Sequence, residues 1–177
     1  ISITKKIGLK NIINLANTFG LGYKQKLEEF PSLAIGSYGD NLLNITNAYS
    51  AINNNGKIHK PSILEKIESF NNQSIWENEF TPNKILDLKV NKKINKLLEK
   101  SVKEGTSKAA SIKGKKIYGK TGTSDGNKDL WFIGSLENLT TGIWIGYDDN
   151  KESELSSGNA AYLWKKFIAE IYKIQMK

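Results

Sequence analysis

This sequence has no cysteine and no arginine, a single histidine and three prolines among its 177 residues. The absence of cysteine excludes disulfides, thiol catalysis and cysteine-based zinc sites. The lone His59 excludes, within this chain, metal sites that are built from several histidines. No apolar run approaches the length of a membrane-spanning helix, and no signal peptide is recognisable at the start. We expect no metal and no cofactor.

Positive charge is in excess, with 26 basic residues, all lysine, against 18 acidic ones and a net charge of +8. Such a balance can indicate nucleic acid, an anionic membrane surface or an acidic substrate as partner. The lysines are scattered through segments of helical pattern, without a basic stripe or an aromatic–basic platform. We therefore interpret them as a solvated surface and expect no nucleic-acid partner. The chain starts without Met, from which we expect a fragment or an excised domain.

Three stretches have the apolar spacing of amphipathic helices. Their apolar residues are Leu9, Ile12, Ile13 and Ala16 in the first, Leu42, Ile45, Tyr49 and Ile52 in the second, and Ile94, Leu97, Leu98 and Val102 in the third. Each stretch ends in a segment that contains glycine, the third at Gly105. Residues 59–80 are predicted to form an extended hairpin with its turn at Asn71 and Asn72.

Three further stretches, 116–123, 129–136 and 140–147, are rich in aromatic and β-branched residues, which is typical of strands. The link 137–139 is short enough to join the last two as an antiparallel pair. A final helix is predicted from about Asn159. Its expected apolar face consists of Leu163, Phe167, Ile171 and Ile174. The order of helices, antiparallel sheet and closing helix predicts one α+β unit, an antiparallel sheet flanked by helices.

Residues 114–121 fit two functional motifs at once. They read G-x-x-x-x-G-K-T, the pattern of a nucleotide-binding P-loop, while residues 120–123 read K-T-G-T, the K-T-G element of penicillin-interacting enzymes. A P-loop needs a buried strand before it and a helix directly after it, because the helix N-terminus faces the phosphates. The preceding segment, 104–113, does not read as a buried strand, and a turn and an aromatic strand follow the motif. The context therefore favours the K-T-G element over nucleotide binding.

The four residues of this element suit acyl transfer from a peptide that ends in a free carboxylate. Lys120 offers a compact positive charge and three donors, and the hydroxyls of Thr121 and Thr123 can donate hydrogen bonds to the carboxylate. Gly122 lets the substrate approach the strand backbone closely. The N–H of Thr123 can donate to the oxyanion of a tetrahedral intermediate. Lys120 and Thr123 are thus candidate catalytic residues, and Lys120, Thr121, Gly122 and Thr123 are candidate substrate-binding residues. The alternative to a functional site is a polar strand end with a solvated lysine.

Several separated blocks, in order along the chain, resemble the transpeptidase domain of class A penicillin-binding proteins, the bifunctional peptidoglycan synthases. The longest block is 101–150, which contains E-G-T-S-K-A-A, G-K-T-G-T-S, W-F-I-G and W-I-G-Y-D-D. Residues 5–21, 31–37 and 45–64 are similar to a helix, a P-S-L-A-L-G segment and a helix with strand entry in that family. The likeness covers most of the chain and is far more specific than K-T-G alone.

The resemblance implies a penicillin-binding transpeptidase or serine β-lactamase-like fold, here incomplete, and a serine-type D-Ala-D-Ala transpeptidase activity. The implied partners are the stem peptides of peptidoglycan, its lipid-linked precursor, and β-lactams, which imitate the donor. The implied location is the extracytoplasmic, periplasmic face of the cell membrane. By the same resemblance Trp131 packs the sheet behind the cleft, and His59 has no catalytic role.

The family also needs a nucleophilic serine in S-x-x-K and an S-x-N element, both ahead of K-T-G. The formal matches are Ser2-Ile3-Thr4-Lys5, Ser69-Phe70-Asn71 and Ser157-Gly158-Asn159. The first lies past the place of the nucleophile, the second lies in the expected turn, and the third follows K-T-G. We therefore expect residues 1–177 to be the C-terminal part of the domain and to be inactive alone. The expected partner of this part is the upstream part of the same domain. The alternative is a non-catalytic relative that binds stem peptides or a synthase partner.

Overall fold

The computed structural model describes residues 2–22, 27 and 29–174 and has the expected α+β fold. The helices are α1 (Ser2–Ile7), α2 (Leu9–Thr18), α3 (Leu42–Asn53), α4 (Leu88–Glu104) and α5 (Ser157–Ile171), with the 3-10 turns η1 (Pro31–Ile35), η2 (Lys108–Ala110) and η3 (Asp125–Asn127). The strands are β1 (Lys57–Ile58), β2 (Lys66–Glu68), β3 (Ser74–Glu77), β4 (Asn83–Lys84), β5 (Ile117–Thr123), β6 (Asp129–Leu136) and β7 (Leu139–Gly146). Each helix and strand predicted from the sequence falls on one of these elements.

The largest sheet consists of β5, β6 and β7, which are antiparallel with β6 in the middle. Its register sets Thr121 of β5 opposite Phe132 of β6, and Phe132 opposite Ile143 of β7. Every residue of β6 from Phe132 to Leu136 is buried. Both β5 and β7 are edge strands of the described sheet, so each has one side that is not paired with another described strand.

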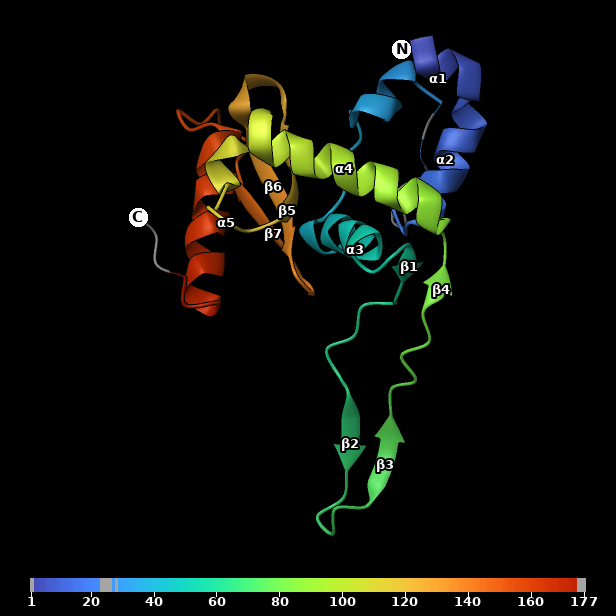
Figure 1. Cartoon of the computed structure of the whole chain (residues 1–177). Helices are drawn as coiled ribbons and strands as arrows, with labels where there is room; N and C mark the ends of the chain where they lie inside the picture. Colours follow the sequence, from blue (N-terminus) through green and yellow to red (C-terminus); the bar gives the residue numbers. More distant parts are fainter. Residues whose placement is uncertain (1, 23–26, 28, 175–177) are drawn as a thin grey trace.

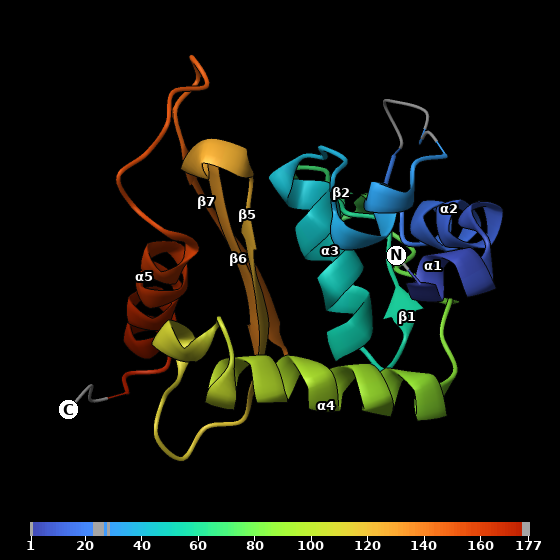
Figure 2. The same ribbon diagram turned by 90° about the horizontal axis from the view of Figure 1, so that it is seen from above.

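Helices cover both faces of this sheet (Figure 2). α5 packs on one face, against all three strands, and α3 packs on the other face, over β6 and β7. α3 approaches so closely that a Cβ at Gly142 of β7 would clash with the side chain of Thr46. α4 runs across the molecule and packs against β5 (Figure 1). The strand that carries the K-T-G element is therefore held by β6 on one side and supported by α4.

The core between α5 and the sheet is centred on Trp164, which is fully buried. Its ring meets the ring of Phe132 edge to face, with centroids 5.3 Å apart. The arrangement leaves no room at Gly134, where a Cβ would lie 2.6 Å from a ring atom of each aromatic. Glycine in the middle of β6 therefore allows the tryptophan of α5 to lie directly on the sheet.

The prediction of the buried face of the last helix, α5, is wrong. The buried residues of α5 are Ala160, Ala161, Trp164, Ile168 and Ala169. Leu163, Phe167 and Ile171, which the spacing had placed inward, are each more than two fifths exposed, and Ile174 is half-buried. Trp164 and the alanines on the same face of the helix fit closely against the sheet. The larger aliphatic and aromatic side chains form an uncovered stripe on the outer side of the helix.

The predicted hairpin is confirmed and projects from the body as an arm (Figure 1). β2 and β3 pair antiparallel with Ile67 opposite Trp76, and Asn72 in the turn has a positive φ of 59°. The short strands β1 and β4 pair at the base of the arm. Phe70 at the tip is fully exposed. The arm lies away from the sheet that carries K-T-G.

We expect Gly134→Ala to destabilise the chain by about 1–3 kcal/mol, because the added methyl group overpacks the contact between Phe132 and Trp164. Urea unfolding followed by tryptophan fluorescence would measure the change. Gly39→Ala is the matched control, since a Cβ there meets nothing within 4 Å. Equal unfolding midpoints for the two variants would contradict this description of the core.

Candidate functional site

The K-T-G element lies inside β5, an edge strand of the sheet. A P-loop is a loop between a strand and a helix, so this position does not fit one. Residues 120 and 121 are followed by two more strand residues and the η3 turn instead of a helix. Because side chains alternate along a strand, Lys120 and Gly122 share one face of the sheet, and Thr121 and Thr123 share the other. The free side of β5 presents this element to its surroundings. The geometry thus excludes the P-loop interpretation, which the sequence context had made less favourable than the K-T-G element.

The Lys120 ammonium is exposed at the strand edge and lies against its own backbone. Its Nζ donates to the carbonyl oxygen of Thr121 at 2.7 Å. Among the described residues no carboxylate lies within ion-pair distance of this ammonium, although several other lysines have such partners. A strongly hydrated cation that still has donors to offer can bind an anionic group at this edge.

The two threonines differ in exposure. Thr123 is exposed at the end of β5, whereas Thr121 is only 7% exposed. The hydroxyl of Thr121 lies 2.8 Å from the hydroxyl of Thr106, at hydrogen-bond distance. Thr106 precedes η2 and was not singled out from the sequence. The only signal for it was its place in the E-G-T-S-K-A-A stretch.

Gly122 lies over Trp131 of β6, its partner in the register. A Cβ at Gly122 would lie 3.2 Å from the Cβ of Trp131, a tight contact. Trp131 is half-buried, beside Trp144 of β7. The tryptophan therefore packs next to the K-T-G backbone; that it does not touch substrate remains a prediction.

A hydrogen-bonded turn holds the end of β5, directly after Thr123. The Ser124 hydroxyl donates to Asp129 Oδ2 at 3.0 Å and accepts from the Asp129 N–H at 2.8 Å. The indole N–H of Trp144 donates to Asp129 Oδ1 at 2.9 Å. Asp129 thus connects the turn to all three strands. The sequence pattern did not indicate this role, because the contact with Trp144 depends on the register of β6 and β7.

Glu99 connects α4 to the entry of β5. Its two carboxylate oxygens lie 2.7 Å from Lys103 Nζ and 3.7 Å from Lys116 Nζ. The hydrogen bond from Lys103 holds the pKa of Glu99 below its ordinary value, and the charges of both lysines act in the same direction. The carboxylate is therefore ionised at neutral pH, where it can hold the residue that precedes β5 near the helix.

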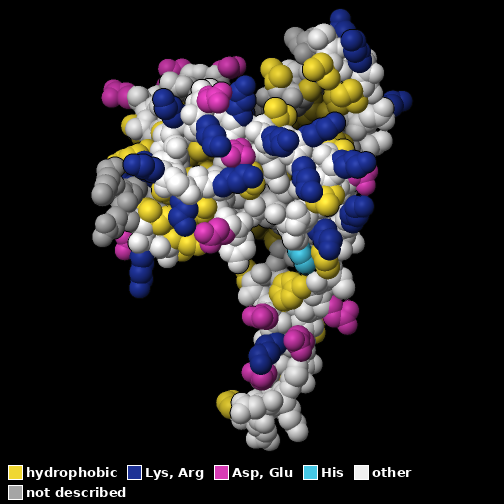
Figure 3. All heavy atoms as spheres, in the orientation of Figure 1, with side chains coloured by type: hydrophobic (Ala, Val, Ile, Leu, Met, Phe, Trp, Pro, Cys, Tyr) yellow, Lys and Arg dark blue, Asp and Glu magenta, His cyan; other side chains and the backbone are white. Residues whose placement is uncertain are grey.

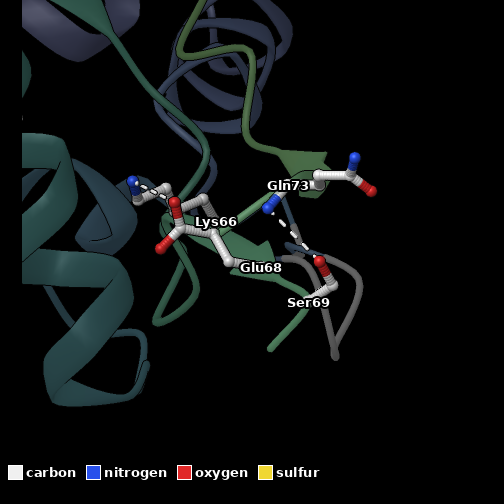
Figure 4. A network of polar contacts seen from close by, with 4 residues as sticks. All are labelled: Lys66, Glu68, Ser69 and Gln73. Atoms are coloured by element: carbon white, nitrogen blue, oxygen red, sulfur yellow. Dashed lines mark hydrogen bonds and ion pairs between the residues drawn. The ribbon is translucent and has the colours of Figure 1, made fainter. Parts of the chain in front are cut away.

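The serines of the formal S-x-x-K and S-x-N matches lie on other elements than the strand that carries K-T-G. Ser2 is exposed at the start of α1, and Ser157 begins α5. Ser69 closes the hairpin turn at the end of the arm, where its hydroxyl accepts from the N–H of Gln73 at 3.2 Å, beside the ion pair of Lys66 and Glu68 (Figure 4). The role of Ser69 is therefore explained by the turn itself.

The lysines spread over the face that α4 crosses and are interspersed with other side chains (Figure 3). In the described part of the chain, His, Asp and Glu side chains form no cluster that could hold a metal ion. None of the described helices has both the length and the apolar character that a bilayer span requires. His59 is half-buried and follows β1, away from β5.

Two shallow hollows of the described surface lie away from residues 120–123. One of about 500 Å³ is lined by Tyr147 and residues 151–155. Another of about 520 Å³ lies near the turn between β6 and β7, with Asn53, His59 and Asn138 among its lining residues. Neither includes residues 120–123. Lys120 and Thr123 of the K-T-G element are exposed, and neither of these two hollows reaches them.

Comparison with known sequences identifies the relatives of this chain. Residues 1–162 match the family described as the penicillin binding protein transpeptidase domain. Penicillin-binding protein 1A of Rickettsia prowazekii (strain Madrid E) is 31% identical over 175 residues, which cover 86% of this chain and 22% of that protein. The chain therefore spans less than a quarter of the length of this curated relative.

Solved structures share the fold. The crystal structure of penicillin-binding protein 1A from Haemophilus influenzae matches with a TM-score of 0.82 at 18% identity, over 98% of this chain and 32% of that one. The D,D-transpeptidase domain of a peptidoglycan glycosyltransferase from Eggerthella lenta matches with a TM-score of 0.70 at 20% identity, over 98% of this chain and 51% of that one. The chain thus shares its fold with about half of the second of these solved chains and a third of the first.

We expect Asp129→Ala to loosen the end of β5, because the Ser124 hydroxyl and the Trp144 indole both lose their acceptor. Hydrogen bonds to a charged group contribute about 2 kcal/mol each, less where they are exposed. Amide hydrogen exchange of Thr123 and Ser124 should accelerate at least tenfold. Asp125→Ala in the same turn is the control, since the structure gives its exposed side chain no hydrogen bond. Unchanged exchange in the Asp129 variant would contradict the role of this turn.

Proposed function

The chain belongs to the penicillin-binding protein transpeptidase family, and we propose that it forms the C-terminal part of a domain that cross-links peptidoglycan stem peptides by serine acyl transfer. One observation carries this proposal: K-T-G-T lies on an edge strand of the described sheet, and its exposed lysine has no described carboxylate within ion-pair distance. The stem peptide, as it stands on its lipid-linked precursor, is the proposed substrate, and β-lactams are the proposed inhibitors. The proposed location is the extracytoplasmic face of the cell membrane.

In the proposed reaction the free side of β5 receives the donor peptide. The Lys120 ammonium and the hydroxyls of Thr121 and Thr123 bind its terminal carboxylate. Gly122 leaves the backbone of the strand open to the peptide. The N–H of Thr123 then donates to the oxyanion that forms when a serine attacks the scissile carbonyl. Loss of one such donor costs on the order of 10²–10³ in rate.

The serine belongs, in this proposal, to a preceding part of the same domain. Two features of the fold support the existence of a covering partner. Leu163, Phe167 and Ile171 form an apolar stripe on the outer side of α5, and each is almost half exposed. Apolar side chains that gather on one face of this kind are typical of a surface that another part of a protein covers. The edge of β7 is also unpaired within the described residues. A preceding part that pairs with β7 and packs on α5 would bury both. A further segment of that part, on the free side of β5, would supply the wall opposite K-T-G.

The alternative is a relative that binds stem peptides or a synthase partner without forming an acyl-enzyme. It has the same K-T-G wall but lacks a nucleophile in the complete polypeptide. The two possibilities differ in one chemical outcome, which is whether a serine is acylated.

Penicillin acylation followed by intact-mass spectrometry tests the proposal. Residues 1–177 alone should gain no adduct, whereas a polypeptide that carries them after an S-x-x-K part should gain one penicilloyl group. Lys120→Ala should slow this acylation on the order of 10²-fold, because the carboxylate loses its counter-charge. Lys113→Ala, which changes an exposed lysine outside the motif, is the matched control.

An adduct on residues 1–177 alone would refute the division of the site between two parts. A folded longer polypeptide that carries S-x-x-K and remains unmodified would refute the catalytic role and favour the non-catalytic relative.

A further inference from the structure

We propose that Thr106 is a positioning residue of this site, which acts through the hydroxyl of Thr121. The inference rests on the proposed function and adds to it a residue outside the K-T-G element. It starts from the hydrogen bond that joins Thr106 Oγ1 to Thr121 Oγ1 at 2.8 Å, between residues 15 positions apart in the chain. Thr106 itself is exposed, while Thr121 is 7% exposed.

The direction of this hydrogen bond decides what Thr121 can do. A hydroxyl has one hydrogen to donate and two lone pairs that accept. If Thr121 donates to Thr106, it has no hydrogen left for a carboxylate, which is an acceptor only. If Thr106 donates to Thr121, the hydrogen of Thr121 is free to point at the substrate. Carboxylate binding by Thr121 therefore requires Thr106 as the donor, and two hydroxyls in series strengthen each other.

The backbone around Thr106 is fixed independently of Thr121. The next residue, Ser107, is fully buried, and its hydroxyl lies 2.8 Å from that of Ser101 in the last turns of α4. The backbone N–H groups of Gly105 and Ser107 both donate to the carbonyl of Ser101, at 3.0 and 3.2 Å. A Cβ at Gly105 would lie only 3.0 Å from that carbonyl oxygen. The end of α4 thus holds Thr106 against β5, which suits a residue whose task is to orient another.

The other end of the loop is equally well held. Ala110 in η2 is fully buried in the core cluster that includes Trp164, and its N–H donates to the carbonyl of Ser107 at 3.0 Å. Thr106 therefore lies between a helix end and a core residue, with its side chain directed at the one K-T-G hydroxyl that is buried.

Acylation kinetics of the longer polypeptide that carries the nucleophile would test the proposal, with benzylpenicillin and its methyl ester as probes. Thr106→Val should lower the acylation rate with benzylpenicillin about threefold to tenfold, which corresponds to one hydrogen bond of ordinary net strength. The rate with the methyl ester should change clearly less, because its neutral ester carbonyl is a weaker acceptor for the Thr121 hydroxyl than a carboxylate. Thr106→Ser should restore the wild-type rate with benzylpenicillin.

Two variants make the test specific. Thr140→Val removes a hydroxyl from a similar pair, with Ser135 at 2.9 Å, away from K-T-G, and should leave both rates unchanged. In a Thr121→Val background, Thr106→Val should have no further effect, because the two residues act in series.

The outcomes separate this inference from the function on which it rests. A wild-type polypeptide that is not acylated at all overturns the proposed function and this inference with it. A wild-type polypeptide that is acylated, with a Thr106→Val rate equal to wild type, overturns the inference alone. An equal loss with benzylpenicillin and its methyl ester also overturns it, since it indicates a general structural defect.

Discussion

The pairing of β5 with β6 is the interaction on which the rest of the site depends. β6 is enclosed between α5 and α3, and its central residues are buried, so its position is set by the core on both faces of the sheet. β5 is aligned on β6 through seven consecutive register pairs, from Ile117 to Thr123. One side of the K-T-G strand is therefore rigidly held, while the other side is free to bind. A hydrogen-bonded extended peptide is the natural ligand for such an edge.

Contacts with residues outside β5 hold the strand at both of its ends and near its middle. At its start, Glu99 of α4 links to Lys116. At its end, Asp129 ties the turn to Ser124 and to Trp144. Between them, Thr106 reaches Thr121 from the loop after α4. The strand that carries the K-T-G element, and the hydroxyl of Thr121 within it, are thus held by residues that are distant in sequence, as precise positioning of a site requires.

Local patterns predicted the elements well, because they depend on neighbours in sequence. Helical spacing located α2, α3, α4 and α5, and the three aromatic, β-branched stretches became β5 to β7. The buried face of α5 could not be read in the same way. The spacing predicted that the large residues Leu163 and Phe167 are buried, whereas Trp164 and the alanines on its face of the helix pack against the sheet.

Contacts between elements were the part that the sequence could not predict. K-T-G-T was found from its motif, and its sequence context favoured this element over a P-loop. The roles of Asp129 and Thr106 depend on the strand register and on the path of the loop after α4. No sequence pattern indicated Asp129, and the E-G-T-S-K-A-A stretch contained Thr106 without indicating its contact with Thr121.

The central claim is that residues 120–123 form an anion-binding strand edge. The most direct measurement is an NMR titration of the ¹⁵N-labelled chain with N-acetyl-D-alanyl-D-alanine, with the C-terminal amide of the same peptide as control. The account predicts saturable amide shifts at Lys120, Thr121, Gly122 and Thr123 with the carboxylate peptide and much smaller shifts with the amide. Shifts that are absent from these four residues in a folded chain, or that are equal for both peptides, would contradict it.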